Sequence, residues 1–180
     1  MAELIIINGK YANENAIPNV IRYITRTRPN ETRAGELIDF GACGASNTFP
    51  EMMIRQFEYI QRVYPSQCRE PRRIWHEILS LDNQEHEIMM NAVFLLIDLA
   101  KACCQYYYYE MGFQAAYAVH HADATKRLHI HFAINTTSCI NGKKRHESKN
   151  DFEQRRLLFC GWFQTYLRTA LSIQQVDAKA

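Results

Sequence analysis

The chain has 180 residues, of which 47% are hydrophobic and 22% are charged, and its formal net charge is +2. A chain of this length folds most simply as one domain, residues 1–180, around a single core. The small net charge excludes a polycation, so any binding to nucleic acid has to come from local basic clusters.

The sequence gives no sign of export or membrane insertion. The N-terminal segment, residues 1–8, lacks a basic stretch followed by a long apolar core. The longest apolar run, residues 92–100, is interrupted by Asp98 and is too short to span a bilayer. The six cysteines have no metal-like spacing such as C-x-x-C, which favours reduced thiols. These features predict a cytoplasmic protein with no membrane partner.

Short strands and amphipathic helices alternate in the first half of the chain. The β-favouring run Leu4–Ile7, closed by the turn signal Asn8-Gly9, predicts a first strand. A helix is expected from about Pro18, which a first helical turn tolerates, and it should end before Pro29. The pattern further predicts a strand over 35–40, a helix over 48–64 with Thr48 as its N-cap, and a strand over 74–81.

The second half begins with a long helical pattern and continues into a hairpin. Apolar residues at helical spacing predict a single helix over about 85–109. Two short strands, 114–121 and 128–135, flank a polar turn, and a final helix over 151–171 precedes an expected edge strand over 172–176. This order of elements predicts an α/β (α+β) sandwich whose sheet is largely antiparallel around the hairpin.

The hairpin gathers three histidines. Side chains alternate along a strand, so Val119 and His120 point to opposite faces. On the second strand the apolar residues at 130, 132 and 134 share one face, and His129 and His131 share the other. With the apolar residues turned toward the core, His120, His129 and His131 meet on one polar face. Three imidazoles can hold a divalent cation and leave coordination positions open, as in a catalytic metal site.

The residues of this hairpin also resemble a known motif. The runs Ala118-Val119-His120-His121 and Leu128-His129-Ile130-His131 are similar to motif III of the relaxases, the nucleases that start conjugative DNA transfer. His129-Ile130-His131 is similar to the signature of the HUH endonucleases. The likeness is greatest to the P-type relaxases of conjugative plasmids and covers about Ile17 to Ile173. It implies a five-stranded, largely antiparallel palm of the HUH type flanked by helices.

The resemblance implies a tyrosine nucleophile. In P-type relaxases the nucleophile lies in an apolar-basic-Tyr-Ile context near the N-terminus, which Ile21-Arg22-Tyr23-Ile24 matches. A phenoxide can attack phosphorus and later leave, so a phosphotyrosyl bond keeps the energy needed to reseal the strand. Tyr11 is the alternative nucleophile, and a structural tyrosine at the edge of the core is the alternative interpretation of Tyr23.

The resemblance also implies a metal cofactor and a base. The divalent ion would be Mg²⁺ or Mn²⁺, with Zn²⁺ as the alternative, held by His120, His129 and His131. The hairpin turn is longer than in relatives, which leaves His121 as the alternative to His120: His120 keeps the strand register, whereas His121 keeps a His-x-Asp pattern with Asp123. Asp123, a histidine or an oxygen ligand of the ion could assist removal of the tyrosine proton, and the sequence does not choose among them.

Basic residues on two loops are candidate phosphate contacts. Arg72 and Arg73 precede the strand over 74–81, and a second cluster, Lys143, Lys144 and Arg145, follows an Asn-Gly turn. In relatives a serine in the loop before the strand that corresponds to residues 74–81 contacts DNA near the scissile phosphate. Ser66 is the candidate for this role, although its offset from His76 departs from the family pattern.

The resemblance implies the function of a conjugative relaxase. Such an enzyme nicks single-stranded oriT DNA beside an inverted repeat, through a 5′-phosphotyrosyl intermediate, and later rejoins the strand. The expected partners are relaxosome accessory proteins and the coupling protein of a type IV secretion system, in a bacterial cytoplasm. A rolling-circle replication initiator and a non-catalytic oriT-binding accessory module with the same fold are the alternatives.

Overall fold

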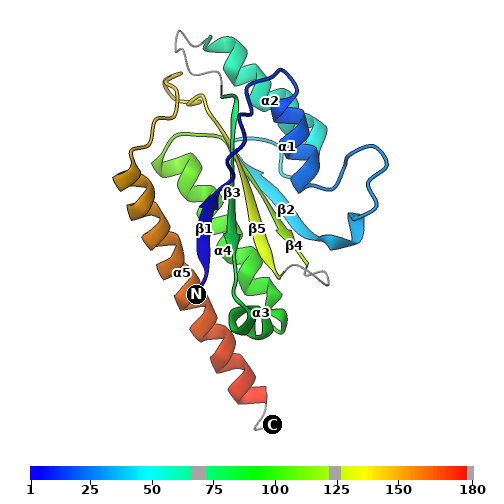
Figure 1. Cartoon of the computed structure of the whole chain (residues 1–180), viewed down its shortest axis with the longest axis vertical. Helices are drawn as coiled ribbons and strands as arrows, with labels where there is room; N and C mark the ends of the chain where they lie inside the picture. Colours follow the sequence, from blue (N-terminus) through cyan, green and yellow to red (C-terminus); the bar gives the residue numbers. More distant parts are fainter. Residues whose placement is uncertain (66–71, 122–126, 178–180) are drawn as a thin grey trace.

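A five-stranded sheet forms the centre of the computed structural model, which describes residues 1–65, 72–121 and 127–177 (Figure 1). Its strands are β1 (Glu3–Ile6), β2 (Leu37–Cys43), β3 (Ile74–Ser80), β4 (Ala115–His120) and β5 (His129–Asn135). Their spatial order is β1-β3-β5-β4-β2, and every neighbouring pair is antiparallel. The predicted α/β fold with a largely antiparallel five-stranded sheet is therefore confirmed.

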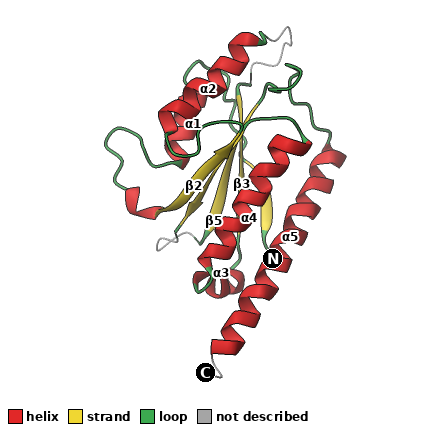
Figure 2. Cartoon of the chain, turned by 180° about the vertical axis from the view of Figure 1, so that it is seen from behind, coloured by secondary structure: helices red, strands yellow, loops and turns green. Residues whose placement is uncertain are grey.

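Helices cover both faces of the sheet. On one face lie α1 (Ala16–Ile24) and α2 (Pro50–Val63), and on the other lie α3 (Asn83–Met90), α4 (Val93–Gln105) and α5 (Lys149–Asp177), as opposite views show (Figure 1 and Figure 2). A short 3-10 helix, η1 (Ala34–Glu36), leads into β2, and a π-helical turn, η2 (Tyr106–Glu110), continues α4. None of the helices in the described residues is long and apolar enough to cross a membrane.

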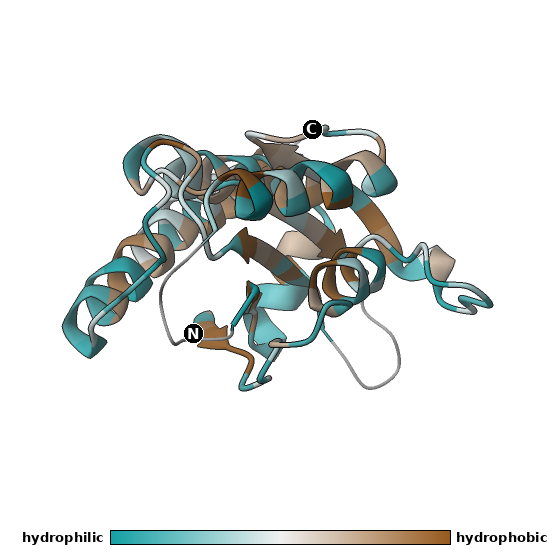
Figure 3. Ribbon diagram, turned by 90° about the horizontal axis from the view of Figure 1, so that it is seen from above, coloured by the Kyte–Doolittle hydropathy of each residue, from teal (hydrophilic) through white to brown (hydrophobic). Residues whose placement is uncertain are grey.

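The larger of two hydrophobic cores lies between the sheet and the α3, α4 and α5 layer. Val119 on β4 and Ile130 and Phe132 on β5 are fully buried there, together with Leu99 of α4 and Phe159 of α5. Figure 3 shows largely hydrophobic strands between the two helical layers. The apolar side chains of the hairpin thus share one face, as their period of two predicts. Burying each of them stabilises the fold by roughly 1.5–3 kcal/mol.

The smaller core, under α1 and α2, is lined on the sheet side by small residues. Ala116 and Ala118 on β4 and Ala133 on β5 are fully buried, in one cluster with Ile17 and Ile21 of α1. Side chains of this size let a helix approach the sheet closely. The histidines of β4 and β5 continue the same rows at alternate positions. The packing of α1 against these alanines therefore also places the C-terminal end of this helix beside the histidines.

The segment predicted as one helix over 85–109 forms three elements instead. α3 begins with a capping box, in which Asp82 and Glu85 each accept a hydrogen bond from the other's backbone N–H. The chain turns at Asn91-Ala92 before α4, and its last residues form η2. Ala92 is buried in the larger core. The turn thus lets both helices bury their apolar sides on one sheet face, which helical spacing alone does not reveal.

Two further predictions are wrong. The expected edge strand over 172–176 is the last part of α5, where Ile173 packs against the larger core and the Gln174 side chain donates to the Ile88 carbonyl. Thr48 does not cap α2, because the helix begins at Pro50 with Phe49 in the cap position. The first error concerns the type of element, because α5 continues through residues 172–176. The second concerns a boundary, because the cap of α2 lies one residue later than expected.

Candidate active site

Three histidines meet where β4 and β5 pair. His120 lies directly opposite His129 in the antiparallel register, and His131 follows two residues later on the same face of β5. One ring nitrogen of each histidine lies within 4.8 Å of the others. The ring centroids of His120 and His131 are 4.5 Å apart, and those of His129 and His131 are 4.8 Å apart. The structure therefore brings together the three residues that strand alternation groups.

These histidines do not form the open polar face that the sequence pattern suggests, because α1 covers them. His120, His129 and His131 are 0%, 9% and 1% exposed. At the end of α1 the Ile24 carbonyl accepts a hydrogen bond from His120 Nε2, and Arg26 Nη2 donates to His120 Nδ1 at 3.1 Å. Burial, and then the neighbouring imidazoles, lower the pKa of His131 well below its ordinary value. This ring is therefore neutral at pH 7, which is the form that binds a metal ion.

The hydrogen bonds of two histidines orient a lone pair that could bind a cation. His129 Nδ1 lies 2.7 Å from the Arg127 carbonyl, so Nδ1 carries the proton and Nε2 carries the lone pair. His131 Nδ1 lies 2.9 Å from His76 Nε2, while His131 Nε2 is buried without a hydrogen-bond partner in the described part of the chain. Burying a polar atom without a partner is costly. The donor set thus fits a divalent ion bound by imidazole nitrogens.

A fourth histidine, His76 on β3, lies next to the cluster. β3 pairs with β5 so that Ile78 lies opposite His131, and the rings of His76 and His131 are 5.1 Å apart. The Tyr11 hydroxyl lies 3.2 Å from His76 Nδ1. Burial lowers the pKa of His76 to about 4, so this ring too is neutral at pH 7. The sequence pattern places His76 in a strand but does not reveal that this strand lies beside β5.

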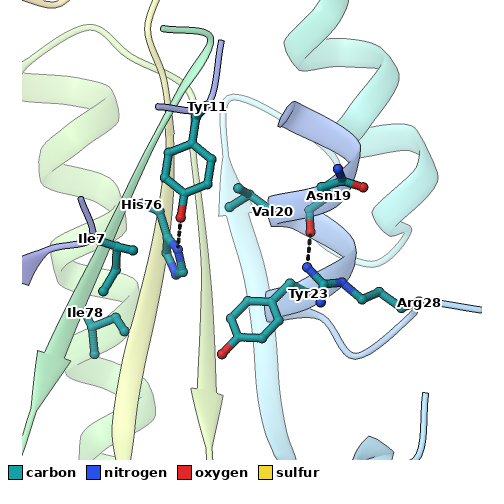
Figure 4. Close-up of a pocket in the computed structure, with 8 residues that line it drawn as sticks. All are labelled: Ile7, Tyr11, Asn19, Val20, Tyr23, Arg28, His76 and Ile78. Atoms are coloured by element: carbon teal, nitrogen blue, oxygen red, sulfur yellow. Dashed lines mark hydrogen bonds between the residues drawn. The ribbon is translucent and has the colours of Figure 1, made fainter. Parts of the chain in front are cut away.

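Tyr23 on α1 faces the histidines. Its ring is 5.4 Å from that of His131 and 5.9 Å from that of His76, both in edge-to-face geometry. The side chain is half-buried and lines a pocket of about 290 Å³. Tyr23 and Arg28 lie on one side of this pocket, and Tyr11 and His76 lie on the other (Figure 4). The predicted nucleophile thus lies beside the histidine cluster, whereas the hydroxyl of the alternative, Tyr11, is engaged with His76.

Three arginines that the sequence pattern did not single out surround Tyr23. The guanidinium carbons of Arg28, Arg26 and Arg33 lie 4.7, 4.9 and 5.9 Å from the centre of the Tyr23 ring. Arg26 is buried and contacts His120, whereas Arg28 is exposed. Three arginines within ten residues of the tyrosine, in the segment 26–33, are the signal that could have identified them. Arg26 pairs with Glu36 at 2.6 Å and Arg33 pairs with Glu31 at 3.4 Å, so part of this positive charge is compensated locally.

Three other candidates lie apart from the cluster or outside the described residues. His121 is exposed, and its backbone N–H donates to the Glu36 carbonyl at 2.6 Å. Within the described ranges, the group that could hold a metal contains His120 and not His121. Asp123 and Ser66 lie outside the described residues.

The basic loop residues lie near the far end of β5. The Lys144 amine donates to the Arg72 carbonyl and to Thr136 Oγ1, one residue beyond β5. A strand rises about 3.3 Å per residue, so this point is roughly 20 Å along the strand from His129. Of the candidates here, Lys143 is exposed, and Arg72, Arg73 and Lys144 are half-buried. These residues therefore lie well apart from the histidine cluster.

Arg145 corrects one expectation for this loop. Its side chain is buried, and Nη2 donates to Glu77 at 2.8 Å and to Glu147 at 2.9 Å. The guanidinium also lies 4.9 Å from the centre of the Trp75 ring. Two carboxylates and an aromatic face thus hold this arginine inside the protein, where it connects the loop to β3. In this position the Arg145 side chain does not face solvent, as the predicted phosphate contact would require.

An antiparallel five-stranded sheet that carries a histidine cluster opposite a helix-borne tyrosine defines the class of protein as a relaxase-type nuclease. A model of the family "Relaxase: MobA/VirD2-like, nuclease domain" matches residues 23–159. The chain therefore belongs to the MobA/VirD2-like relaxases and is the nuclease domain of a conjugative relaxase, a DNA-nicking enzyme. No curated protein matches the sequence.

Two solved structures share the fold. The relaxase domain of MobM, bound to oriT DNA of plasmid pMV158 and to Mn, is 12% identical with a TM-score of 0.58, over 92% of this chain and 85% of that chain. The conjugative relaxase TrwC, copper-bound and in complex with oriT DNA, is 11% identical with a TM-score of 0.55, over 97% of this chain and 71% of that chain. At such identities the likeness shows a common fold.

Proposed function

We propose that this domain nicks one strand of oriT DNA by transesterification, with Tyr23 as the nucleophile. The observation that carries the proposal is the position of the Tyr23 ring, 5.4 Å from the ring of His131. A tyrosine and a metal-binding group that face each other at this distance can act on one phosphate. The oriT DNA and the metal bound by MobM and TrwC support the same ligands for this chain.

The residues that would hold the ion are His120, His129 and His131. When bound, a divalent ion would polarise a non-bridging oxygen of the scissile phosphate and help to position it. Of the expected ions, an all-imidazole set favours Mn²⁺ or Zn²⁺ over Mg²⁺, which prefers oxygen ligands. His120 Nδ1 accepts a hydrogen bond from Arg26, so ligation through this nitrogen requires Arg26 to release it.

The proposed reaction exchanges one phosphoester bond for another. Tyr23 Oη attacks phosphorus, and the bond between phosphorus and the 3′-oxygen breaks as the new bond forms. The phenol proton passes to a base, for which we propose Asp123 or a neighbouring imidazole, and the departing oxygen takes up a proton to become a 3′-OH. The product is a 5′-phosphotyrosyl adduct. Because this ester stores the energy of the original bond, attack by a 3′-OH reverses the step and reseals the strand.

The proposed substrate is single-stranded oriT DNA beside an inverted repeat. Arg28 and Arg33, next to Tyr23, would bind phosphates close to the nick. Lys143, with Arg72, Arg73 and Lys144, would bind the flanking strand, and Ser66 stays a candidate contact. Relaxosome accessory proteins and a type IV coupling protein are the proposed partners, in the bacterial cytoplasm.

Covalent capture tests this proposal. Incubation with Mn²⁺ and a single strand that contains the nic site should give a protein–DNA adduct on Tyr23. Addition of an oligonucleotide with the matching 3′-OH should then yield joined strands without ATP. Tyr23→Phe removes only the hydroxyl, so DNA binding should persist while adduct and joining disappear.

Peptide mapping of the adduct distinguishes the alternatives. An adduct on Tyr11 would overturn the assignment of Tyr23. Cleavage that leaves no tyrosine adduct would mean that water is the nucleophile, and transesterification would be rejected. The Tyr11→Phe variant keeps Tyr23 and should therefore still form the adduct.

A further inference from the structure

A chain of hydrogen-bonding groups runs from the pocket to the histidine cluster. The Tyr11 hydroxyl lies 3.2 Å from His76 Nδ1, and His76 Nε2 lies 2.9 Å from His131 Nδ1. The two histidines are 5% and 1% exposed, so these contacts are largely shielded from water. Figure 4 shows the first contact at the wall of the pocket.

A role of His131 as a metal ligand would set the direction of both hydrogen bonds. A neutral imidazole has one N–H donor and one acceptor nitrogen. The buried Nε2 of His131, which lacks a partner among the described residues, is the nitrogen that can face a cation, so it must carry the lone pair. Nδ1 of His131 then carries the proton and donates it to His76 Nε2. His76 in turn carries its proton on Nδ1 and donates it to the Tyr11 hydroxyl oxygen.

Metal-binding histidines commonly have a hydrogen-bond partner of the kind that His76 offers to His131. Such a histidine donates its other ring N–H to an acceptor, which fixes the tautomer and the orientation of the ring. Here the acceptor is a second histidine, whose other ring nitrogen contacts the Tyr11 hydroxyl. Without His76, the proton of His131 could move to Nε2, and this ring would present a donor to the cation.

Tyr11 is itself held in place. Its backbone carbonyl accepts a hydrogen bond from the Arg73 N–H at 2.9 Å, and its backbone has a φ of +41°. A tyrosine rarely adopts a positive φ, which is strained and persists only where the surroundings enforce it. The loop between β1 and α1 is therefore built to hold the hydroxyl at His76.

We propose that His76 is a positioning residue that holds His131 in the tautomer able to bind the metal ion, with Tyr11 holding the ring of His76 in place. This inference rests on the proposed function, because it requires His131 to be a ligand. His76 acts through His131, whose Nδ1 it contacts.

Metal binding to the purified protein gives the first test. Calorimetry with Mn²⁺ should give an affinity for His76→Phe that is about 10- to 100-fold weaker than that of the wild type, the range typical for loss of such a partner. His76→Gln should retain most of the affinity, because its side-chain oxygen can accept from His131 Nδ1. His146→Phe, the same substitution at an exposed histidine outside the site, is the matched control and should bind as the wild type does.

The ring nitrogens of His131 give a second readout that packing alone would not change. In ¹⁵N NMR of the metal-free protein, His131 should be protonated at Nδ1 in the wild type and in His76→Gln. His76→Phe should give a mixture of tautomers, and Tyr11→Phe should affect His76 first.

The outcomes separate this inference from the proposed function. If the wild type does not bind Mn²⁺, the metal site itself is wrong. If the wild type binds and His76→Phe binds equally well with His131 unchanged, the positioning role is rejected while the metal site stands. If Zn²⁺ shifts a ring nitrogen of His76 directly, His76 is a ligand and the positioning role is also rejected.

Discussion

At the scale of single residues, each histidine of the cluster is oriented by a different neighbour. The Arg127 carbonyl holds the Nδ1–H of His129, His76 contacts Nδ1 of His131, and Arg26 and Ile24 engage His120. A change at one ligand therefore removes a lone pair without disturbing the contacts that orient the other two. Because His121 is exposed at the end of β4, it serves as the natural comparison for the buried ligands.

We expect His129→Ala and His131→Ala each to abolish Mn²⁺ binding and DNA cleavage, since each removes one of three proposed ligands. His120→Ala should reduce metal affinity far more than His121→Ala does. Calorimetry measures the affinities, and circular dichroism checks that each variant is folded. If His121→Ala caused the larger loss, the ligand from β4 would have to be reassigned.

At the scale of elements, one buried carboxylate joins four parts of the chain. Glu77 on β3 accepts hydrogen bonds from Tyr107 of η2, from Arg145 in the loop before α5, and from Arg155 of α5. Burial alone would raise the pKa of Glu77, but the Arg145 and Arg155 guanidiniums outweigh it and hold this pKa below its usual range. Glu77 is thus charged, and together with Glu147 it compensates two buried arginines.

Glu77→Gln should lower the free energy of unfolding by roughly 3–5 kcal/mol, because Glu147 alone would then compensate two buried guanidiniums. Urea unfolding followed by tryptophan fluorescence measures the loss. Glu153→Gln is the matched control: Glu153 pairs with Arg156 on the partly exposed surface of α5, so its removal should have a much smaller effect. Equal effects of the two variants would mean that the buried network adds no stability.

The same elements explain what the sequence predicts well and what it does not. The hairpin histidines follow from alternation within β5, a local property that Ile130 and His131 already display. The role of His76 depends on the pairing of β3 with β5, a long-range register that strand patterns do not specify. The burial of Arg145 likewise depends on Glu77, which is 68 residues away in the chain. The sequence thus reveals the alternation within a strand, but it does not reveal which strand is its neighbour in the sheet.

At the scale of the whole molecule, the two faces of the sheet respond differently to acid. The α4 and α5 face contains the Glu77 network, in which the carboxylate is stabilised by two arginines. The α1 face contains buried neutral imidazoles, of which His76 and His131 have lowered pKa values, chiefly because of burial. Protonation of these rings would place positive charge beside Arg26 and Arg28, so acid should act first on the active-site face.

The metal-free protein should therefore lose stability as the pH falls from about 6.5 to about 4. Burial lowers the pKa of His76 from 6.5 to about 4. Within this window the unfolded chain binds a proton that the folded chain does not, which favours unfolding as the pH decreases. The loss from His76 alone is on the order of 3 kcal/mol, and His131 adds to it in the same direction. Urea unfolding at several pH values measures the slope, and His76→Phe should make it shallower. A wild-type stability that is constant from pH 7 to pH 4.5, or an equally steep slope for His76→Phe, would contradict the neutral, buried state of this histidine.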